Sequence, residues 1–175
     1  GVKFSGTKNG VLYENGAKYN GTKNGILYVN GVKFNGTKDG VLYENGAKYN
    51  GTKNGVLYVN GVKFSGTKDG VLYVNGAKFN GTKNGKVYKN GVLLTGKHSD
   101  GKFYQNGVVL TGYNGNTYYV NGVAANGYMA DNTKTKYLFK NGVKQAGRQK
   151  IDGTYYFFDF NTKQMVKHNY VQAQD

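Results

Sequence analysis

The sequence predicts an all-β protein in which tandem short β-hairpin repeats form a β-solenoid. A tyrosine recurs every 15 residues, at Tyr13, Tyr28, Tyr43, Tyr58, Tyr73 and Tyr88. Asn-Gly dipeptides punctuate every copy, and this dipeptide favours type I′ hairpin turns because both central residues adopt positive φ. A short fixed period is typical of repeat architectures in which each unit packs only on its neighbours.

Within the first copy, residues 11–14 (VLYE) and 17–20 (AKYN) have strand character, and Asn15-Gly16 joins them. The segment GTKN at residues 21–24 is then expected to turn the chain into the next unit. Runs this short, joined by tight turns, leave no room for a helix. A lone hairpin is only marginally stable in water, so stacking of successive hairpins is expected to bury their apolar side chains.

The two-residue turn also predicts which side chains share a face. Opposed residues on neighbouring strands lie on the same face, and successive residues alternate between faces. Leu12, Ala17 and Tyr19 are therefore expected on a core face, together with position 14 of each copy. Tyr13 and Lys18 are expected to pair on the opposite, mostly polar face. The same pairing is expected to continue along the ladder (Tyr28 with Lys33, Tyr43 with Lys48, Tyr58 with Lys63, Tyr73 with Lys78).

The repeats change along the chain, although one continuous repeat domain is expected. Residues 1–97 carry regular 15-residue copies, residues 98–127 carry degenerate copies, and residues 128–175 carry longer repeats. The segment 152–171 is expected to form a wider hairpin with a longer turn around residues 161–163. A 30-residue period overlies the first four copies, because ENGAKY alternates with VNGVKF.

The composition limits the partners. The formal net charge is +15, which favours polyanions, although lysines also protect exposed strand edges from aggregation. Nucleic acid is not expected, because Arg148 is the only arginine and base recognition favours arginine. The chain lacks cysteine, so no disulfide or thiolate metal site can form. No apolar run is long enough for a transmembrane segment, and a monomeric fragment of a larger chain is expected.

Catalysis is not expected. Most acidic residues lie beside glycine or in turns, where such residues serve as turn formers. No serine has a histidine and an acid at a recognisable spacing, and His98 and His168 are isolated. Two histidines alone make a poor metal-ligand set, so neither a metal nor a cofactor is expected. The glycines follow the 15-residue period of the turns, which argues against a phosphate-binding loop.

The later units, residues 100–175, carry aromatic, Asn-Gly and Thr-Gly motifs in a fixed order. They are Gly101, Phe103, Tyr104, Asn106-Gly107, Thr111-Gly112 and Tyr113, then Asp152-Gly153, Tyr155-Tyr156-Phe157, Asp159, Thr162 and Met165-Val166. In this order the later units resemble the cell-wall and glucan-binding repeats of Gram-positive surface proteins, including choline-binding-like repeats. The last unit is similar to the glucan-binding domain beside the catalytic core of lactic-acid-bacterial glucansucrases.

This resemblance implies a secreted or cell-surface, noncatalytic carbohydrate-binding module that binds α-glucan of the dextran type. The family usually has tryptophan where Tyr113 stands, and this chain has none. One or two tyrosine platforms with hydrogen-bonding side chains are therefore expected in place of a three-aromatic choline cage. The resemblance points to the degenerate units, with Tyr104, Tyr119, Gln105 and Lys102 as the main candidates and Tyr118 and Tyr88 beside them.

The regular ladder leaves two other readings open. Each ladder tyrosine offers a ring face and a hydroxyl to a sugar, and its paired lysine donates to sugar oxygens or phosphates. Equally, the rings can pack on one another up the stack while lysine stems cover them. Lysines in the predicted connecting turns (Lys8, Lys23, Lys38, Lys53, Lys68 and Lys83) suit an anchor to teichoic or lipoteichoic acid. The remaining alternative is a structural spacer of a surface adhesin.

Overall fold

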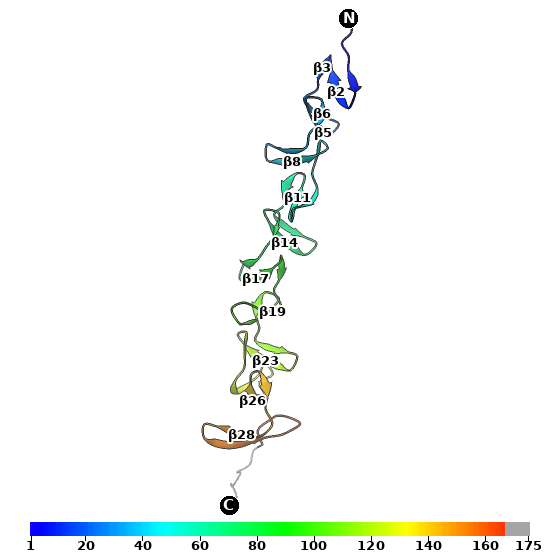
Figure 1. The fold of residues 1–175 in the computed structure, drawn as a ribbon. Coiled ribbons are helices and arrows are strands. Elements are labelled where there is room, and N and C mark those ends of the chain that lie inside the picture. Colours follow the sequence, from blue (N-terminus) through cyan, green and yellow to red (C-terminus); the bar gives the residue numbers. More distant parts are fainter. Residues whose placement is uncertain (167–175) are drawn as a thin grey trace, which may run out of the picture. The chain divides into compact units, whose positions relative to one another are not determined.

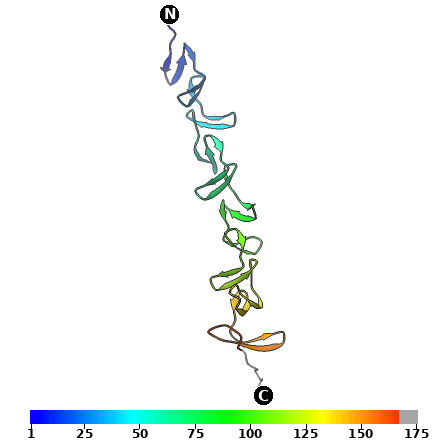
Figure 2. The same cartoon turned by 180° about the vertical axis from the view of Figure 1, so that it is seen from behind.

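The computed structural model describes residues 1–166 and confirms the predicted all-β repeat fold. Its strands are short and antiparallel, and they form a succession of separate small sheets rather than one closed barrel (Figure 1). The reverse view shows the same succession (Figure 2). Over this range no residue is helical, so no helix there is a candidate to cross a membrane.

Backbone packing divides the chain into two compact units. The first comprises Gly1–Asn80 with Asn90–Val92, and the second comprises Gly81–Lys89 with the chain from Leu93 onward. The first unit contains five three-stranded sheets. Their strands are β1 (Gly6–Lys8), β2 (Val11–Glu14), β3 (Ala17–Lys18), β4 (Gly21–Lys23), β5 (Ile26–Val29), β6 (Val32–Lys33), β7 (Gly36–Lys38), β8 (Val41–Glu44), β9 (Ala47–Lys48), β10 (Gly51–Lys53), β11 (Val56–Val59), β12 (Val62–Lys63), β13 (Gly66–Lys68), β14 (Val71–Val74) and β15 (Ala77–Lys78).

The second unit has the same kind of sheet with longer strands toward its end. β18 (Val92–Leu93) lies at the junction of the two units. The other strands are β16 (Gly81–Lys83), β17 (Lys86–Lys89), β19 (Gly96–Lys97), β20 (Phe103–Gln105), β21 (Val108–Val109), β22 (Gly112–Asn114), β23 (Thr117–Val120), β24 (Val123–Ala124), β25 (Gly127–Ala130), β26 (Lys136–Lys140), β27 (Val143–Lys144), β28 (Gly147–Ile151) and β29 (Thr154–Phe158).

Each regular repeat is a three-stranded meander, not the predicted two-stranded hairpin. In the first repeat β1 pairs with β2 (Lys8↔Val11), and β2 pairs with β3 in the predicted register (Tyr13↔Lys18). The GTK segment is thus a strand, and Lys8 and its equivalents lie at its end rather than in a connecting turn. The reason is a second hairpin signal in each copy: Asn9 and Gly10 have φ of 51° and 77°, as a type I′ turn requires.

Every regular repeat therefore has two turns and one linker, and their Asn-Gly pairs differ in environment. We call Asn9-Gly10 and its equivalents the first turn, and Asn15-Gly16 and its equivalents the second turn. Asn20-Gly21 and its equivalents form the linker to the next repeat. The distinction matters because the glycine N–H of the second turn is hydrogen-bonded to the preceding repeat, whereas that of the first turn has no such bond among residues 1–166.

Stacking places the second turn of one repeat on the central strand of the repeat before it. The Leu12 N–H donates to the Gly31 carbonyl (2.7 Å), and the Gly31 N–H donates to the Tyr19 carbonyl (2.7 Å). The linker asparagine adds a third bond, because Asn20 Oδ1 accepts the Asn30 N–H (2.7 Å). This set recurs along the first unit, so each interface between repeats closes mainly through backbone hydrogen bonds.

The central strand supplies most of the buried apolar surface in the first unit. Leu27 is 5% exposed, and its equivalents Leu57 and Leu72 are also buried. Tyr19 is half-buried and packs edge-on against Tyr28, with ring centroids 6.0 Å apart. The predicted burial is therefore confirmed for Leu27, Leu57 and Leu72, whereas Leu12, Leu42 and the aromatic residues after the third strand are half-buried.

The predicted core face was wrong for the third strand. Ala17 is exposed, and its equivalents Val32 and Val62 are each 52% exposed. Position 14 is also exposed where it is Glu14. The neighbouring repeat contacts the central strand through its second turn, and it leaves the third-strand side chains largely uncovered.

In the second unit, aromatic side chains join Leu94, Leu110 and Leu138 in the core. Tyr118, Ala125, Tyr137 and Phe139 form a buried cluster, and the Tyr118 and Phe139 rings stack with centroids 5.1 Å apart. Larger rings on the central strand accompany longer strands in this part of the chain.

The expected wider hairpin near the end of the chain is confirmed as far as residue 166. Phe158 pairs with Met165, and the Asp159 N–H donates to the Gln164 carbonyl (2.9 Å) around the turn. Asp159 Oδ1 accepts the N–H of Thr162 (2.7 Å), which fixes the turn. The rest of that hairpin, residues 167–171, and His168 with it, lie outside the described residues.

Candidate functional site

Two grooves of similar composition lie between stacked repeats of the first unit. One has a volume of about 390 Å³ and the other about 310 Å³, at the lower end of the range for small-molecule sites. Each groove is built from three successive repeats. The first is lined by Thr7, Gly10, Leu12, Tyr28, Val32, Lys33, Asn35 and Asn45. The second is lined by Thr37, Gly40, Leu42, Tyr58, Gly61, Val62, Lys63 and Asn75.

The first groove combines an apolar floor with polar groups that the protein does not use. Leu12 and Val32 provide the apolar surface. Within residues 1–166 the Tyr28 hydroxyl, the Lys33 ammonium and the Asn45 side-chain amide have no hydrogen-bond or ion-pair partner. A hydroxyl, an ammonium and an amide can together donate to and accept from a neutral polyol.

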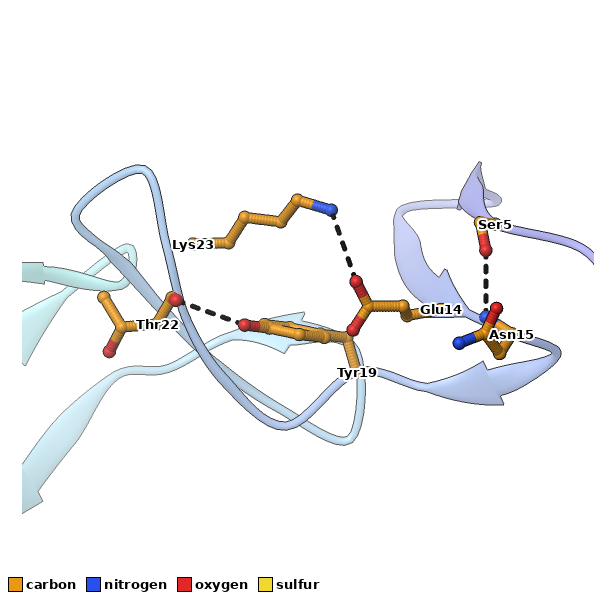
Figure 3. Close-up of polar contacts among 6 residues, drawn as sticks. All are labelled: Ser5, Glu14, Asn15, Tyr19, Thr22 and Lys23. Atoms are coloured by element: carbon orange, nitrogen blue, oxygen red, sulfur yellow. Dashed lines mark hydrogen bonds and ion pairs between the residues drawn. The ribbon is translucent and has the colours of Figure 1, made fainter.

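Neighbouring side chains hold the groove in shape. Tyr28 is braced edge-on by Tyr19, whose own hydroxyl donates to the Thr22 carbonyl (3.1 Å, Figure 3). Asn35 Oδ1 accepts the Asn45 N–H (2.8 Å) and so positions the turn at the rim. The Tyr19 hydroxyl is bonded to the backbone, whereas Tyr28 lines the groove. The two tyrosines in contact therefore have different roles, one structural and one available to a ligand.

Two further contacts of the first repeat appear in the same close-up. Lys23 Nζ lies 4.0 Å from Glu14 Oε1, and Ser5 Oγ accepts the Asn15 N–H (2.9 Å, Figure 3). The Lys23–Glu14 contact is the single ion pair among the residues that the structure describes. Nearly all lysines in this range, Lys33 and Lys63 among them, therefore carry charge that no carboxylate neutralises.

The second groove repeats the first at a spacing of 30 residues. Tyr58 is braced by Tyr49 at 5.9 Å, and Lys63 and Asn75 take the positions of Lys33 and Asn45. Ser65 Oγ accepts the Asn75 N–H (2.8 Å) where Asn35 serves in the first groove. The 30-residue period of the sequence thus reappears as a period of grooves.

The structure pairs the ladder residues as predicted. Tyr28 opposes Lys33 and Tyr58 opposes Lys63 across neighbouring strands. The other pairs have the same register: Tyr13 with Lys18, Tyr43 with Lys48 and Tyr73 with Lys78. These tyrosines are half-buried and pack edge-on against Phe4, Phe34 and Phe64 of the preceding repeat. Each ladder tyrosine therefore packs against the preceding repeat with part of its ring and exposes the rest to solvent.

The degenerate region places its candidate residues differently. The Tyr104 hydroxyl donates to Asp100 Oδ2 (2.7 Å), and the His98 ring lies edge-on at 5.5 Å. The hydrogen bond from Tyr104, followed by that from the Lys102 N–H, lowers the pKa of Asp100, while the same bond raises the pKa of Tyr104. These contacts brace a turn one residue longer than its equivalents, and they leave the Tyr104 hydroxyl already engaged.

The remaining candidates in this region fall into two groups. Tyr119 is half-buried and stacks on Phe103, with centroids 4.8 Å apart, while Gln105 and Lys102 are exposed. Tyr88 is half-buried. Tyr118 was predicted as a surface candidate, and this is corrected: it is 4% exposed and stacks in the core. The tyrosine pair Tyr118-Tyr119 alternates across the strand, so one ring must face the interior.

Sequence reasoning did not single out a second aromatic surface in the second unit. Arg148 lies over the Tyr155 ring, with its guanidinium carbon 3.9 Å from the centroid. Arg148, Tyr155, Tyr156 and Phe157 line a mostly apolar pocket of about 220 Å³. The run Tyr155-Tyr156-Phe157 within the family motif was the available signal, but only the pairing of β28 with β29 brings Arg148 onto it.

One buried polar cluster of the second unit serves the fold. Asp131 is 7% exposed and accepts hydrogen bonds from the Tyr113 hydroxyl (2.7 Å) and from Thr133 Oγ1 (2.6 Å). Burial and the bond to Asp131 raise the pKa of Tyr113 well above its ordinary 10.0. Burial also pushes the pKa of Asp131 upward, but the hydrogen bonds from Thr133, Tyr113 and Thr135 outweigh it and leave that pKa lowered. Lys144 Nζ lies 3.6 Å over the Tyr137 ring beside this cluster.

The described part of the chain contains no group of three histidine or acidic side chains placed to hold a metal ion.

Comparison with known proteins adds a distant likeness. No family model matches the chain, and no curated protein matches it. A solved structure of ASR alternansucrase in complex with isomaltononaose is similar, with 22% sequence identity and a TM-score of 0.23. The match covers 84% of this chain but 16% of that one, so the chain spans a small part of the enzyme's length.

Proposed function

We propose that this chain is a noncatalytic carbohydrate-binding module that holds a neutral α-glucan of the dextran type in its grooves between repeats. The observation that supports it best is the pair of grooves at Tyr28 and Tyr58. In each, a hydroxyl, an ammonium and an amide that have no partner among residues 1–166 line a groove with apolar side chains. Sugar recognition needs this mixture of apolar face and convergent hydrogen-bonding groups.

The resemblance of residues 100–175 to glucan-binding repeats gives the proposal its setting. The chain would belong to an extracellular protein of a Gram-positive bacterium and would accompany a glucansucrase-type enzyme. Each groove is shallow and would bind a sugar unit only weakly, at about the millimolar level, or −4 kcal/mol. Several grooves on one long polymer would raise the avidity roughly 10²–10⁴-fold.

The test is affinity electrophoresis in gels that contain dextran. Replacing both groove tyrosines (Tyr28→Phe with Tyr58→Phe) removes two hydroxyls but keeps the packing of the rings. We expect this double variant to lose most of the retardation by dextran. The matched control is Tyr19→Phe with Tyr49→Phe, which alters tyrosines that line neither groove and occupy positions where other repeats carry phenylalanine. Equal retardation of the two double variants would refute the placement in the grooves.

A second pair of variants isolates the lysines. Lys33→Gln with Lys63→Gln changes the grooves, whereas Lys38→Gln with Lys68→Gln removes the same charge elsewhere. For a neutral glucan we expect only the first pair to weaken binding. If substitution of Tyr104 and Tyr119, rather than of the groove residues, abolishes retardation by dextran, the sugar platform lies in the degenerate units.

One observation favours a second candidate, an anchor to anionic teichoic or lipoteichoic acid. The chain carries a net charge of +15, with a single ion pair among residues 1–166. Binding to such a polymer should collapse between low and moderate salt, because exposed charges are screened within about 8–10 Å. If retention on dextran does not change with salt, the lysines serve to keep the protein soluble and to protect strand edges from aggregation. Retention on neither polymer would leave a structural spacer.

A further inference from the structure

Apart from Asn114-Gly115, where the asparagine ends strand β22, the Asn-Gly pairs of this chain stand in three environments that differ in whether the reactive atoms are free. The chemistry concerned is deamidation. The backbone nitrogen after an asparagine attacks the side-chain amide carbon Cγ, the Cγ–Nδ2 bond breaks, and ammonia leaves with the proton of that nitrogen. Water then opens the resulting succinimide to aspartate or isoaspartate. Glycine favours the attack because it has no Cβ to hinder it.

At the first turn both reactive groups are free. The N–H groups of Gly10, Gly25, Gly55 and Gly85 have no hydrogen-bond partner within residues 1–166. A Cβ built on any of these glycines would meet nothing within 4 Å, so the turn has room to move. The preceding asparagine side chains also make no hydrogen bond with the described residues.

At the second turn the attacking nitrogen is held by the preceding repeat. The Gly31 N–H donates to the Tyr19 carbonyl (2.7 Å), and Gly31 is buried. A Cβ at Gly31 would lie 2.6 Å from the Leu12 carbonyl oxygen. Closure of a succinimide there requires the two repeats to separate first.

At the linker the amide itself is held. Asn20 Oδ1 accepts the Asn30 N–H (2.7 Å), and Asn20 Nδ2 donates to the Lys18 carbonyl (3.4 Å). Rotation of this amide toward the Gly21 nitrogen would break both bonds. The same pair of bonds is present at Asn35, Asn50 and Asn80.

The sequence already carries the product of the reaction at the first turn. Asp39 and Asp69 occupy this position with φ of 51° and 50°, and Asn9 and Asn24 have 51° and 52°. The turn therefore accommodates aspartate without a change of backbone conformation. The second turn of every repeat, in contrast, carries asparagine.

We propose that the folded chain undergoes spontaneous deamidation selectively at the first-turn asparagines Asn9, Asn24, Asn54 and Asn84. Conversion of all four adds four negative charges beside lysines and lowers the net charge of +15 by four. The groove asparagines Asn45 and Asn75 are spared, because they belong to second turns. Conversion of Asn9 changes the backbone beside Gly10 of the first groove, whereas the first turn of the second groove already carries Asp39. Ageing of the protein then weakens its attraction to polyanions and leaves the second groove chemically intact.

The test measures conversion at each asparagine by peptide mass spectrometry after incubation at mildly alkaline pH. Trypsin releases residues 24–33 as one peptide that contains both turns of the second repeat, and fragmentation separates Asn24 from Asn30. The aspartate product at Asn9 has the sequence of the native peptide 39–48, so conversion at Asn9 is read from its isoaspartate product. Digestion at mildly acidic pH limits conversion during handling. A parallel incubation in denaturant gives the intrinsic deamidation rate at each Asn-Gly pair. The quantity compared is the ratio of the deamidation rate in the folded chain to that in the unfolded chain.

We expect that ratio to be at least about tenfold higher at first turns than at second turns or linkers, which corresponds to a difference of about 1.4 kcal/mol in opening. The variant Asp69→Asn should create a fifth site that converts at the rate of Asn24, while Asn75 in the same repeat stays intact. Its tryptic peptide, residues 69–78, differs in sequence from that of every other repeat. Equal ratios in the three environments would overturn the proposal, as would an unreactive asparagine at position 69. Neither result depends on whether the grooves bind glucan.

Discussion

At the scale of the single residue, glycine at the second turn meets two demands at once. Its φ is positive, as a type I′ turn requires, and the central strand of the preceding repeat approaches its Cα directly. Gly61 has φ of +76°, and a Cβ there would lie 2.5 Å from Val41 Cγ1 and 2.6 Å from the Leu42 carbonyl oxygen. Gly55, at the first turn of the same repeat, has the same φ but nothing within 4 Å.

This difference predicts unequal costs for the same substitution. Gly55→Ala and Gly61→Ala both place a side chain at positive φ, which costs about 1–2 kcal/mol. Gly61→Ala also forces two repeats apart, which should cost about 1–3 kcal/mol more. Urea unfolding followed by circular dichroism measures both, with Gly55→Ala as the control for backbone strain. Equal losses of stability would mean that the close approach of repeats contributes nothing.

Asp131 makes the second unit sensitive to acid. Its hydrogen bonds hold its pKa below the ordinary 3.8, so the folded state binds a proton less readily than the unfolded state. The resulting stability is present above pH 3.8 and is lost as pH falls through the lower pKa of the folded state. Acid unfolding monitored by tyrosine fluorescence should report this loss.

Asp131→Asn tests the assignment. The variant should be less stable at neutral pH, because Tyr113 loses its carboxylate partner, and it should show a weaker dependence on pH below 3.8. A variant with the full acid dependence of the parent would place the responsible carboxyl group elsewhere.

At the scale of the element, the linker side chain fixes the turn that follows it. Asn20 accepts the N–H of Asn30, and Ser65 performs the same task for Asn75. The linker position therefore needs a short side chain with an oxygen, and asparagine and serine both satisfy it. Thr95 and Thr111 do the same for Asn106 and Asn121. This explains why the position varies between asparagine, serine and threonine while the neighbouring glycine does not vary.

Asn20→Ala should accordingly destabilise the first unit by about 1 kcal/mol, the usual cost of one lost hydrogen bond. Asn20→Ser should restore most of it, since serine already occupies this position in two other repeats. Chemical denaturation of the two variants beside the parent gives the comparison. If alanine and serine behave alike, the hydrogen bond to the second turn is not a stabilising contact.

At the scale of the molecule, stability should depend on the number of repeats, because each repeat of the first unit contacts only its neighbours. Deletion of residues 36–65 removes two whole repeats and joins Asn35 to Gly66 in the same phase. We expect a lower unfolding midpoint and a smaller denaturant dependence, since less surface is exposed on unfolding. The circular dichroism spectrum should keep its β and turn character, with negligible helix.

The same deletion removes one of the two grooves. Retardation by dextran should therefore fall by more than half, because avidity depends on simultaneous binding at several sites. An unchanged midpoint would contradict nearest-neighbour stability, and unchanged retardation with an altered midpoint would place the glucan contacts outside residues 36–65.

The sequence by itself determined the all-β repeat fold, the type I′ turns and the pairing of Tyr13 with Lys18. These follow from the φ preference of Asn-Gly and from side-chain alternation, which act over a few residues. The tertiary structure decided the rest. It made GTK a strand, left Ala17 exposed and placed Tyr118 in the core. It also assembled each groove from three repeats, so that Asn45 lines the same groove as Tyr28 and Lys33. Such contacts depend on how one repeat packs on the next. Backbone hydrogen bonds such as that from Leu12 to Gly31 determine this packing, and they cannot be predicted from a local residue pattern because almost any residue type can form them.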